Sequence, residues 1–357
     1  MCADPDLGFH GDAEIAGDHG TVVDLAVNVR PAAPPGWLAE RLSAALTTIA
    51  RYPDSRGARG AAAARHCRHP DEVLLTAGAA EAFTLIARAF SPQYAVVVHP
   101  QFTEPEAALR AAGHEVRRVI LPPDFALPAR AVPAEADLVI IGNPTNPTSV
   151  LHPAALIASL ARAGRVLVVD EAFADCVPGE PESLAARRDV PGLVVIRSLT
   201  KTWGLAGLRV GYVLASAAAV KEIGRMQPPW AVSTPALAAV EACTSSQASA
   251  EADSWAREMG AERDTLAAAL GALPGVRVIP GAQASFLLLR AVPPTGSAAF
   301  YPEATGVRRR LRERGFAVRR GETFPGLGPG WLRVAVRDRS TNEAFTAALA
   351  DVMKGAT

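Results

Sequence analysis

The sequence is poor in the residues that mark several classes of protein. It has four cysteines in 357 residues, and none of them forms a CxxC pair; they are Cys2, Cys67, Cys176 and Cys243. This scatter indicates neither a disulfide framework nor a zinc site, and it suits a reducing cytoplasm best. The seven histidines are dispersed as well, so we expect no metal centre.

The sequence also lacks an excess of positive or negative charge, and it lacks long hydrophobic runs. The formal net charge is +0, which gives no electrostatic argument for binding nucleic acid or an anionic membrane. No apolar run approaches the roughly 20 residues of a membrane span, and the polar segment 1–21 has no signal-peptide core. Since 49% of the residues are hydrophobic, the chain can still bury a large core, and its length favours about two domains.

The most informative feature that is present is a lysine at the end of an apolar run. Lys201 follows the run 193–196, within a glycine-punctuated segment that extends from Ser198 to Arg209. Poor solvation at the end of a buried strand lowers the pKa of a lysine, and a neutral amine can form a Schiff base with an aldehyde. Ser198 and Arg209 are suited to a phosphate. Together they favour a pyridoxal phosphate site, the alternative being a lysine in a surface turn.

Short β-branched runs alternate with helical segments over residues 94–214. This alternation predicts an α/β fold with a mostly parallel central sheet covered by helices on both faces. After residue 230 the pattern changes to a long alanine-rich helical region followed by further strands. We therefore expect an irregular arm over 1–35, a large domain over 36–230 and a smaller α+β domain over 231–357.

Three polar or aromatic residues besides Lys201 fall at the carboxyl ends of predicted strands, where such sheets bind ligands. Asp170 follows a buried run and could pair with a protonated pyridine nitrogen, or it could cap the next helix. Asn146 could donate to the ring oxygen of the cofactor, although Asn-Pro also favours turns. Phe102 could stack on the ring or belong to the core.

Other positions are suited to anions. Gly78, Ala79 and Ala80 follow a short strand and open a helix, which leaves free backbone N–H groups. Arg319 ends a predicted strand, and Arg333 lies inside an otherwise apolar one. A guanidinium in such a strand is costly unless it meets a carboxylate or phosphate, and a structural ion pair is the alternative to a ligand.

Taken in order along the chain, these residues resemble the fold type I pyridoxal phosphate enzymes. The branch they are most similar to contains histidinol-phosphate aminotransferase and threonine-phosphate decarboxylase, and the resemblance covers nearly the whole chain. It implies an aspartate-aminotransferase-like fold. The matching blocks are Tyr52-Pro53, Gly78-Ala79-Ala80-Glu81, Asn146-Pro147-Thr148, Asp170-Glu171-Ala172-Phe173, Ser198-Leu199-Thr200-Lys201, Gly207-Leu208-Arg209 and Leu332-Arg333-Val334.

The resemblance implies specific roles in catalysis. Lys201 looks like the Schiff-base lysine and proton shuttle, Asp170 like the partner of the pyridine nitrogen, and Asn146 like the residue that holds the ring oxygen. Arg333 resembles the arginine that binds the α-carboxylate of the substrate.

The resemblance also implies a phosphate cup and a dimer. The backbone amides of Ala79 and Ala80, together with Ser198 and Arg209, resemble the groups that hold the cofactor phosphate. Tyr52 looks like the tyrosine that reaches this phosphate from the neighbouring subunit, which implies a homodimer with shared active sites.

Within the branch, further segments resemble the decarboxylase of cobalamin biosynthesis. The segments around His10, Asn28 and Arg319 are similar to its motifs, which implies His10 and Arg319 near the substrate phosphate and Asn28 near the carboxylate. Phe173 stands where the aminotransferases usually have a tyrosine, whereas Asp12 replaces a glycine of the decarboxylase motif. We expect a decarboxylase of O-phospho-L-threonine or a related phosphorylated or phosphonate amino acid. The alternatives are an aminotransferase of the histidinol-phosphate type and a non-catalytic homologue.

Overall fold

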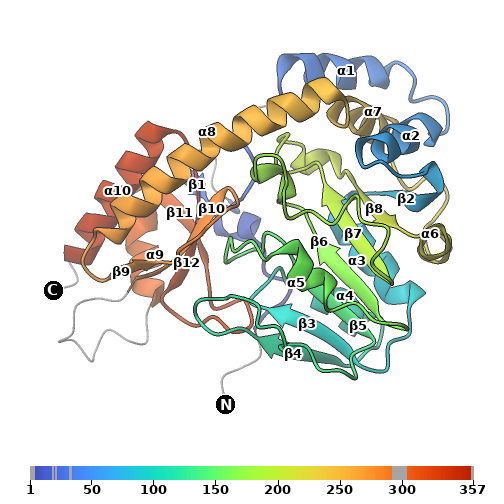
Figure 1. Ribbon diagram of the computed structural model, residues 1–357. Coiled ribbons are helices and arrows are strands. Elements are labelled where there is room, and N and C mark those ends of the chain that lie inside the picture. The colour runs from blue at the N-terminus through green and yellow to red at the C-terminus, as the bar shows by residue number, and fades with distance from the viewer. Residues whose placement is uncertain (1–4, 18–19, 21, 32–33, 292–303, 355–357) are drawn as a thin grey trace.

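The computed structural model describes residues 5–17, 20, 22–31, 34–291 and 304–354. Its larger sheet has seven strands in the order β2-β8-β7-β6-β5-β3-β4 (Figure 1). Their bounds are β2 (Val73–Thr76), β3 (Ala95–His99), β4 (Val116–Ile120), β5 (Leu138–Gly142), β6 (Val166–Asp170), β7 (Leu193–Ser198) and β8 (Gly211–Ala215). The five strands β3 to β7 run parallel, and β8 runs antiparallel to both of its neighbours, so the predicted mostly parallel sheet is confirmed.

Helices cover both faces of this sheet because successive side chains of each strand point to opposite sides. In β3, Val96 and Val98 face one core while Val97 faces the other. The first core is closed by α1 (Gly36–Leu46), α2 (Arg56–Arg65), α5 (Ala154–Ala158) and α7 (Thr234–Cys243). The second is closed by α3 (Gly78–Ala89), α4 (Glu104–Ala111) and α6 (Ala217–Gly224).

A second sheet of five strands forms a smaller body with its own core. Its order is β1-β11-β12-β10-β9, with the bounds β1 (Val23–Leu25), β9 (Val276–Val278), β10 (Phe286–Ala291), β11 (Phe316–Arg320) and β12 (Trp331–Ala335). The long helix α8 (Ser246–Gly271) runs from the α7 corner to the smaller body (Figure 1). There it joins α9 (Ala304–Glu313) and α10 (Arg339–Lys354).

One segment differs from the prediction, and another is divided. The arm is not irregular throughout: β1 pairs parallel with β11, with Val23 opposite Phe316, and a strand of three residues is too short to show an alternating pattern. The expected helical region after residue 234 consists of two helices, since the Ser245 side chain accepts from Ala248 N at 3.2 Å and starts α8 anew. Since α7 packs against α1 and α2, the domain boundary at residue 230 stays a prediction.

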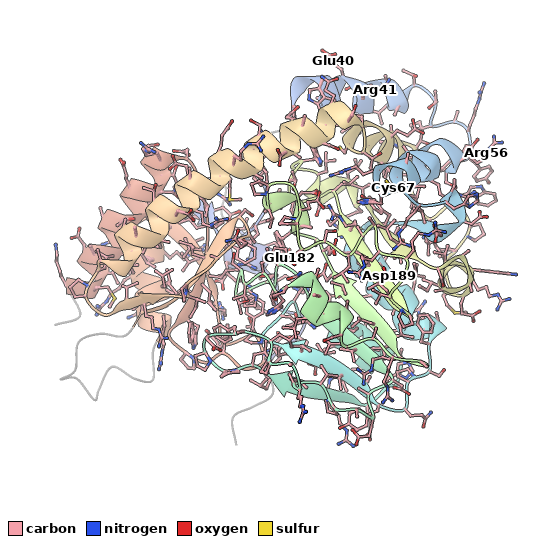
Figure 2. All side chains as sticks on the ribbon, in the orientation of Figure 1. Glu40, Arg41, Arg56, Cys67, Glu182 and Asp189 are labelled. Carbon is pink, nitrogen blue, oxygen red and sulfur yellow. The ribbon has the colours of Figure 1, made fainter. Side chains whose placement is uncertain are left out.

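Short 3-10 turns connect several elements, and they are η1 (Gly11–Glu14), η2 (Pro70–Glu72), η3 (Ala174–Cys176) and η4 (Ala206–Leu208). Side chains of both charges lie on the helices of the larger body, among them Glu40 and Arg41 on α1 (Figure 2). No helix within the described residues is long and apolar enough to cross a membrane. The same part of the chain contains no group of three or more His, Cys, Asp or Glu side chains placed to hold a metal ion.

Candidate active site

A cavity of about 500 Å³ lies between the carboxyl ends of the large-sheet strands and the smaller body. Lys201, which follows β7, lies on its wall, and its carbonyl accepts a hydrogen bond from Arg30 N at 2.9 Å. The cavity brings together most of the residues singled out in the sequence. The predicted residues that line it are His10, Asn28, Ala80, Phe102, Asn146, Lys201, Arg209, Arg319 and Arg333.

The surroundings of Lys201 favour its neutral form. Burial, together with the positive charges of Arg333 and Arg209, lowers the pKa of Lys201 to about 8. A substantial fraction of the amine is therefore unprotonated and nucleophilic near neutral pH, as attack on an aldehyde requires.

Asp170, the last residue of β6, is an acidic group whose negative charge would be buried. Burial raises the pKa of its carboxyl to about 6, although Ala172 N donates to Oδ1 at 3.0 Å and Lys201 is nearby. A cationic partner would restore the charged form of this carboxylate. The protonated nitrogen of a pyridine ring is such a partner, so Asp170 is suited to pyridoxal phosphate.

The groups predicted to hold a phosphate surround the start of α3. Ala77 provides no side-chain cap, so the first-turn amides of α3 keep their donors free for an anion. Gly78 has φ +81°, and a Cβ added there would stand 2.9 Å from Nη2 of Arg209. Arg209 itself has φ 55°, and Ser198 Oγ lies 2.8 Å from Thr200 Oγ1 nearby. Only glycine leaves room for the guanidinium to reach this helix terminus.

Two buried arginines lie directly opposite each other at the substrate end of the cavity. Arg319 of β11 and Arg333 of β12 are register partners in the antiparallel pair, and both side chains are buried. Like charges placed opposite each other in a sheet repel. An anion between or beside the two guanidinium groups would offset this repulsion.

The hydrogen-bond partners of Arg333 are all uncharged. Its Nη1 donates to Asn146 Oδ1 at 2.5 Å and its Nη2 donates to the carbonyl of Ala26. With the amide of Asn28 turned so that its oxygen faces the guanidinium, Nη1 and Nε of Arg333 donate to it at 3.0 and 3.1 Å. Because Oδ1 of Asn146 is engaged, its amide nitrogen is left to donate to a ligand. Burial and the charge of Arg319 lower the pKa of Arg333.

Arg319 has the same kind of environment. Its Nη2 donates to the carbonyl of Phe9 at 2.6 Å, and its guanidinium lies 4.7 and 4.8 Å from the ring centres of Phe9 and Phe324. Burial lowers its pKa to about 10. Among the residues that the structure describes, neither Arg319 nor Arg333 has an ion pair with a carboxylate.

Residue Glu104 is part of the site and was missed in the sequence. Its Oε1 lies 2.6 Å from His10 Nε2, and both side chains line the cavity. The available signal was its position two residues after Phe102, which follows β3, at the same edge of the sheet as the other site residues. His10 lies 5.6 Å from the ring centre of Phe102, which places the predicted substrate and cofactor contacts side by side.

Some predicted residues lie outside the cavity wall. Tyr52 is 76% exposed and stacks on Trp230 with ring centres 4.2 Å apart, so within this chain it does not reach the site. Phe173 lines the cavity and packs edge-on against Phe286 at 4.9 Å, and it brings no hydroxyl to the site. Ala79, Ser198 and Asp170 are not among the residues that line the cavity; they lie in the first turn of α3, at the end of β7 and at the end of β6.

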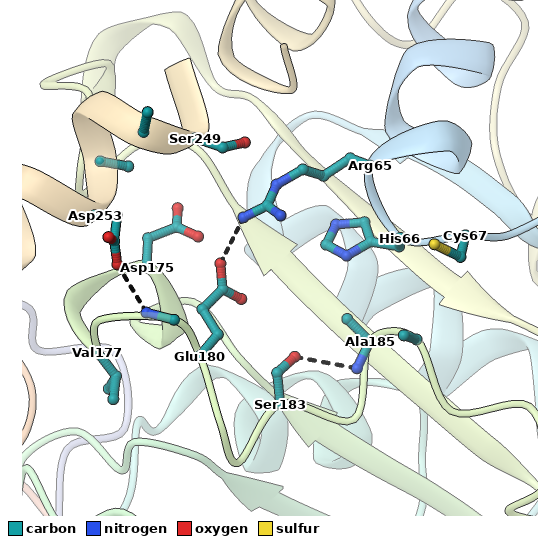
Figure 3. A pocket seen from close by; sticks show the side chains of 14 residues that line it. Arg65, His66, Cys67, Asp175, Val177, Glu180, Ser183, Ala185, Ser249 and Asp253 are labelled. Atoms are coloured by element: carbon teal, nitrogen blue, oxygen red, sulfur yellow. Dashed lines mark hydrogen bonds and ion pairs between the residues drawn. The ribbon is translucent and has the colours of Figure 1, made fainter. Parts of the chain in front are cut away.

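A second cavity of about 460 Å³ lies between the end of α2, the start of α8 and the segment after η3 (Figure 3). Its charged groups are paired: Arg65 binds Glu180 at 2.8 Å and Asp253 accepts from Gly179 N at 2.8 Å. Burial lowers the pKa of His66 to about 3, so its imidazole is neutral. Because its charged groups are paired within the chain, we interpret this second cavity as part of the structural framework.

Comparison with known proteins identifies the family. The family model for aminotransferase class I and II matches residues 20–349. The chain belongs to this family. A histidinol-phosphate aminotransferase of Mycobacterium tuberculosis is 47% identical over 332 residues, covering 92% of this chain and 86% of that relative. A threonine-phosphate decarboxylase of Salmonella typhimurium is 33% identical over 349 residues, covering 94% and 92%.

The fold is shared with solved structures of the same branch. The crystal structure of an L-threonine-O-3-phosphate decarboxylase from Porphyromonas gingivalis superposes with a TM-score of 0.81 and 26% identity, covering 92% of this chain and 99% of that one. The predicted fold type I architecture is confirmed, and the cofactor of this aminotransferase-family protein is pyridoxal phosphate. Identity to the relatives favours the aminotransferase alternative over the decarboxylase that the sequence motifs favoured.

Proposed function

We propose that this protein is a pyridoxal-phosphate-dependent aminotransferase that acts on a small phosphorylated amino compound of the histidinol-phosphate type. The observation that carries the proposal is the pair of buried arginines, Arg319 and Arg333, which lie opposite each other and have no carboxylate partner among the described residues. Two such groups at one end of a cavity favour a substrate with a strongly anionic group. The 47% identical aminotransferase supports the reaction class.

The chain offers a partner for each part of the cofactor. The first-turn amides of Ala79 and Ala80, with Ser198 and Arg209, would hold the phosphate, and Asp170 would hold the ring nitrogen. Asn146 would donate its free amide to the ring oxygen, and Phe102 would cover the ring. When bound, the cofactor withdraws electrons from the substrate carbon that carries the amino group.

The residues of the chain then orient the substrate and move its proton. Arg333 and Arg319 would hold its anionic group, while Asn28 and Asn146 keep Arg333 in place. Because the pKa of Lys201 is lowered to about 8, its amine can both accept a proton from the substrate carbon and return it.

A second candidate function is decarboxylation of a phosphorylated amino acid such as O-phospho-L-threonine. It is favoured by Phe173, which leaves the cavity without the hydroxyl that the aminotransferases usually place there, and by the 33% identical decarboxylase. The two reactions differ in which bond at the substrate carbon stands perpendicular to the cofactor ring. The placement of Arg333 relative to the substrate carboxylate decides between them.

The deciding experiment compares products. The cofactor-loaded protein is incubated with histidinol phosphate and 2-oxoglutarate, and separately with O-phospho-L-threonine in the presence and absence of 2-oxoglutarate. Mass spectrometry showing glutamate and the keto product of histidinol phosphate is the expected result. Loss of carbon dioxide from O-phospho-L-threonine without a keto acid would replace this function by the decarboxylase. Turnover of neither substrate would reject both.

We further propose a cytoplasmic homodimer in which Tyr52 completes the cofactor site of the partner. The exposed stacked pair Tyr52 and Trp230 is suited to such a contact, and the scattered cysteines suit a reducing compartment. Sedimentation analysis should give a dimer, and Tyr52→Ala should weaken cofactor binding. A monomer with unchanged cofactor affinity after Tyr52→Ala would contradict the shared site.

A further inference from the structure

The loop that carries Asn146 is held to the smaller body at two points. This loop, the segment 145–150, is closed by its own backbone, in which Ser149 N donates to the carbonyl of Thr145 at 2.7 Å. At its tip, Asn146 Oδ1 accepts from Nη1 of Arg333 on β12 at 2.5 Å. At its base, the second contact is made by Ser149. Both contacts therefore act on one closed unit, here called the Asn146 loop.

The side chain of Ser149 is the acceptor in the second contact. Its Oγ accepts from Ala284 N at 2.8 Å and from Gln283 N at 3.1 Å, and its carbonyl also accepts from Gln283 N at 2.8 Å. Ser149 and Ala284 are both fully buried, so the N–H of Ala284 has no access to solvent. The hydroxyl of Ser149 thus supplies the acceptor that a buried backbone donor requires.

The backbone conformation of Ser149 favours glycine over serine. Its φ of 63° lies in the left-handed region, where a Cβ is unfavourable and glycine is unstrained. A glycine would relieve the backbone, but it would lose the oxygen that accepts from Ala284 N. Ser149 therefore combines an unfavourable conformation with hydrogen bonds that join the two bodies, and this combination indicates a role for its hydroxyl.

Ala284 lies next to the strand that supports Arg333. It is two residues before β10, which begins at Phe286 and pairs antiparallel with β12. Within this pair Leu288 is the register partner of Arg333. Because the backbones of the two strands are hydrogen-bonded along the ladder, a shift of the start of β10 would be carried to Arg333. Such a shift would change the distance between Arg333 and Asn146.

We propose that Ser149 is a positioning residue for Arg333: its hydroxyl holds the start of β10 to the Asn146 loop and thereby keeps the guanidinium where it meets the anionic group of the substrate. The proposal rests on the function proposed above, because it assigns what positions a part of that substrate site. Ser149 is not among the residues that line the active-site cavity, so it acts through Arg333 and not by contact with a ligand.

The test uses sulfate, an anion that suits a guanidinium and that the enzyme does not consume. Its binding to the cofactor-loaded protein, in which the cofactor occupies its own phosphate cup, is measured by calorimetry. Ser149→Ala should weaken sulfate binding about tenfold, because Arg333 is displaced. Equal sulfate affinity of Ser149→Ala and the unaltered protein would overturn the proposal. Absence of sulfate binding to the unaltered protein would overturn it as well, because Arg333 would then hold no anion.

A second variant, Ser149→Gly, separates positioning from stability. Glycine relieves the left-handed backbone, so Ser149→Gly should unfold at a higher urea concentration than Ser149→Ala. Both variants lack the hydroxyl, so both should weaken sulfate binding to the same extent. If sulfate affinity instead follows stability, so that Ser149→Gly binds as the unaltered protein does, the proposal is overturned.

The matched control is Thr148→Val, which removes the neighbouring hydroxyl of the same loop and keeps the shape of the side chain. Thr148 is also buried, but its Oγ1 accepts from Val150 N at 3.3 Å, within the Asn146 loop. The sulfate affinity of Thr148→Val should therefore equal that of the unaltered protein. A loss as large as that in Ser149→Ala would show that any disturbance of the loop suffices, and it would overturn the proposal.

The effect must also pass through Arg333. In Arg333→Met sulfate should still bind through Arg319, but more weakly, and adding Ser149→Ala should weaken this binding no further. A further tenfold loss in the double variant would overturn the proposal. Failure to transaminate histidinol phosphate rejects the proposed function but leaves these sulfate results intact.

Discussion

Two buried arginines of this protein lie on strands and have opposite environments. Arg197 on β7 binds the carboxylates of Glu171 at 3.0 Å and Glu180 at 2.6 Å through Nη1, and Asp175 through Nη2. Arg333 on β12 is equally buried and donates only to amide and carbonyl oxygens. Arg197 belongs to the charged network beside the second cavity, whereas Arg333 faces the active-site cavity.

The difference separates structural charge from functional charge. Moving a guanidinium out of water costs several kcal/mol, and a carboxylate partner within the chain offsets much of that cost. Arg197 has that compensation in the folded chain itself. Among the described residues Arg333 has no carboxylate partner, and in the proposed function a ligand supplies this compensation. Replacing a residue of the charged network around Arg197 should therefore mainly lower the free energy of unfolding. Replacing a residue at the active-site cavity should mainly lower activity or substrate binding.

The largest effect is expected for Lys201→Ala, which removes the reactive group of the ligand-facing region. Turnover should fall by at least about 10⁴-fold, because no other lysine lines the cavity in the described part of the chain. Reduction with borohydride should no longer attach the cofactor to the chain. Lys221→Ala, on an exposed part of α6, is the control and should keep full activity. Normal turnover by Lys201→Ala would refute the assigned role.

Arg197→Met should be the most destabilising change in the structural region. It leaves Glu171, Asp175 and Glu180 crowded together without their shared cation, and removing one partner of a buried ion pair costs about 3–5 kcal/mol. Urea unfolding of the protein should show the loss. The control is Arg225→Met, whose pair with Glu222 is exposed and should change the free energy of unfolding by less than about 1 kcal/mol.

Arg333→Met should show the reverse pattern. Removal of a buried charge without a carboxylate partner relieves its desolvation, while the oxygens of Ala26 and Asn146 lose a donor. The loss in unfolding free energy should therefore be less than half of that in Arg197→Met. The KM for a carboxylate or phosphate substrate should rise by about 100-fold. Equal destabilisation by the two variants would remove the distinction between the two regions.

The same two arginines show what sequence could and could not reveal. Arg333 interrupts the apolar run of Trp331–Ala335, and this pattern marks it as a guanidinium in need of an anion, whereas Arg197 follows the apolar run 193–196 and was not singled out in the sequence. The carboxylate partners of Arg197 come from a different segment. The antiparallel pairing of β11 with β12 places Arg333 opposite Arg319. Whether the anion belongs to the chain or to a ligand depends on these tertiary contacts, which no local pattern contains.

The strands and the cofactor-binding residues, in contrast, could be predicted from the sequence. Strand periodicity and glycine spacing are local, and they placed Asp170, Asn146 and Lys201 at the carboxyl edge of the sheet. The contact between His10 and Glu104 joins residues 94 positions apart and could not be inferred from spacing. The choice between transamination and decarboxylation depends on a bond angle at the substrate, which residue identity alone does not determine.

A smaller effect is expected for the pH dependence of cofactor uptake. Only the neutral amine of Lys201 attacks the aldehyde, and burial lowers its pKa to about 8 in the cofactor-free protein. The rate of covalent attachment, followed by stopped-flow absorbance, should therefore rise about tenfold per pH unit below pH 8 and level off above it. A rate that continues to rise to pH 10, as for an ordinary lysine, would show that the ligand-facing region does not lower this pKa.

The smallest effect is expected for Asp12→Asn, which sharpens the comparison inside the cavity itself. Asp12 is exposed at the cavity wall and acts on the guanidinium of Arg319 and the amine of Lys201 only through its charge. Its removal should tighten sulfate binding about two- to threefold, less at high ionic strength. Unchanged or weaker sulfate binding by Asp12→Asn would show that this carboxylate does not act on the two cations through its charge.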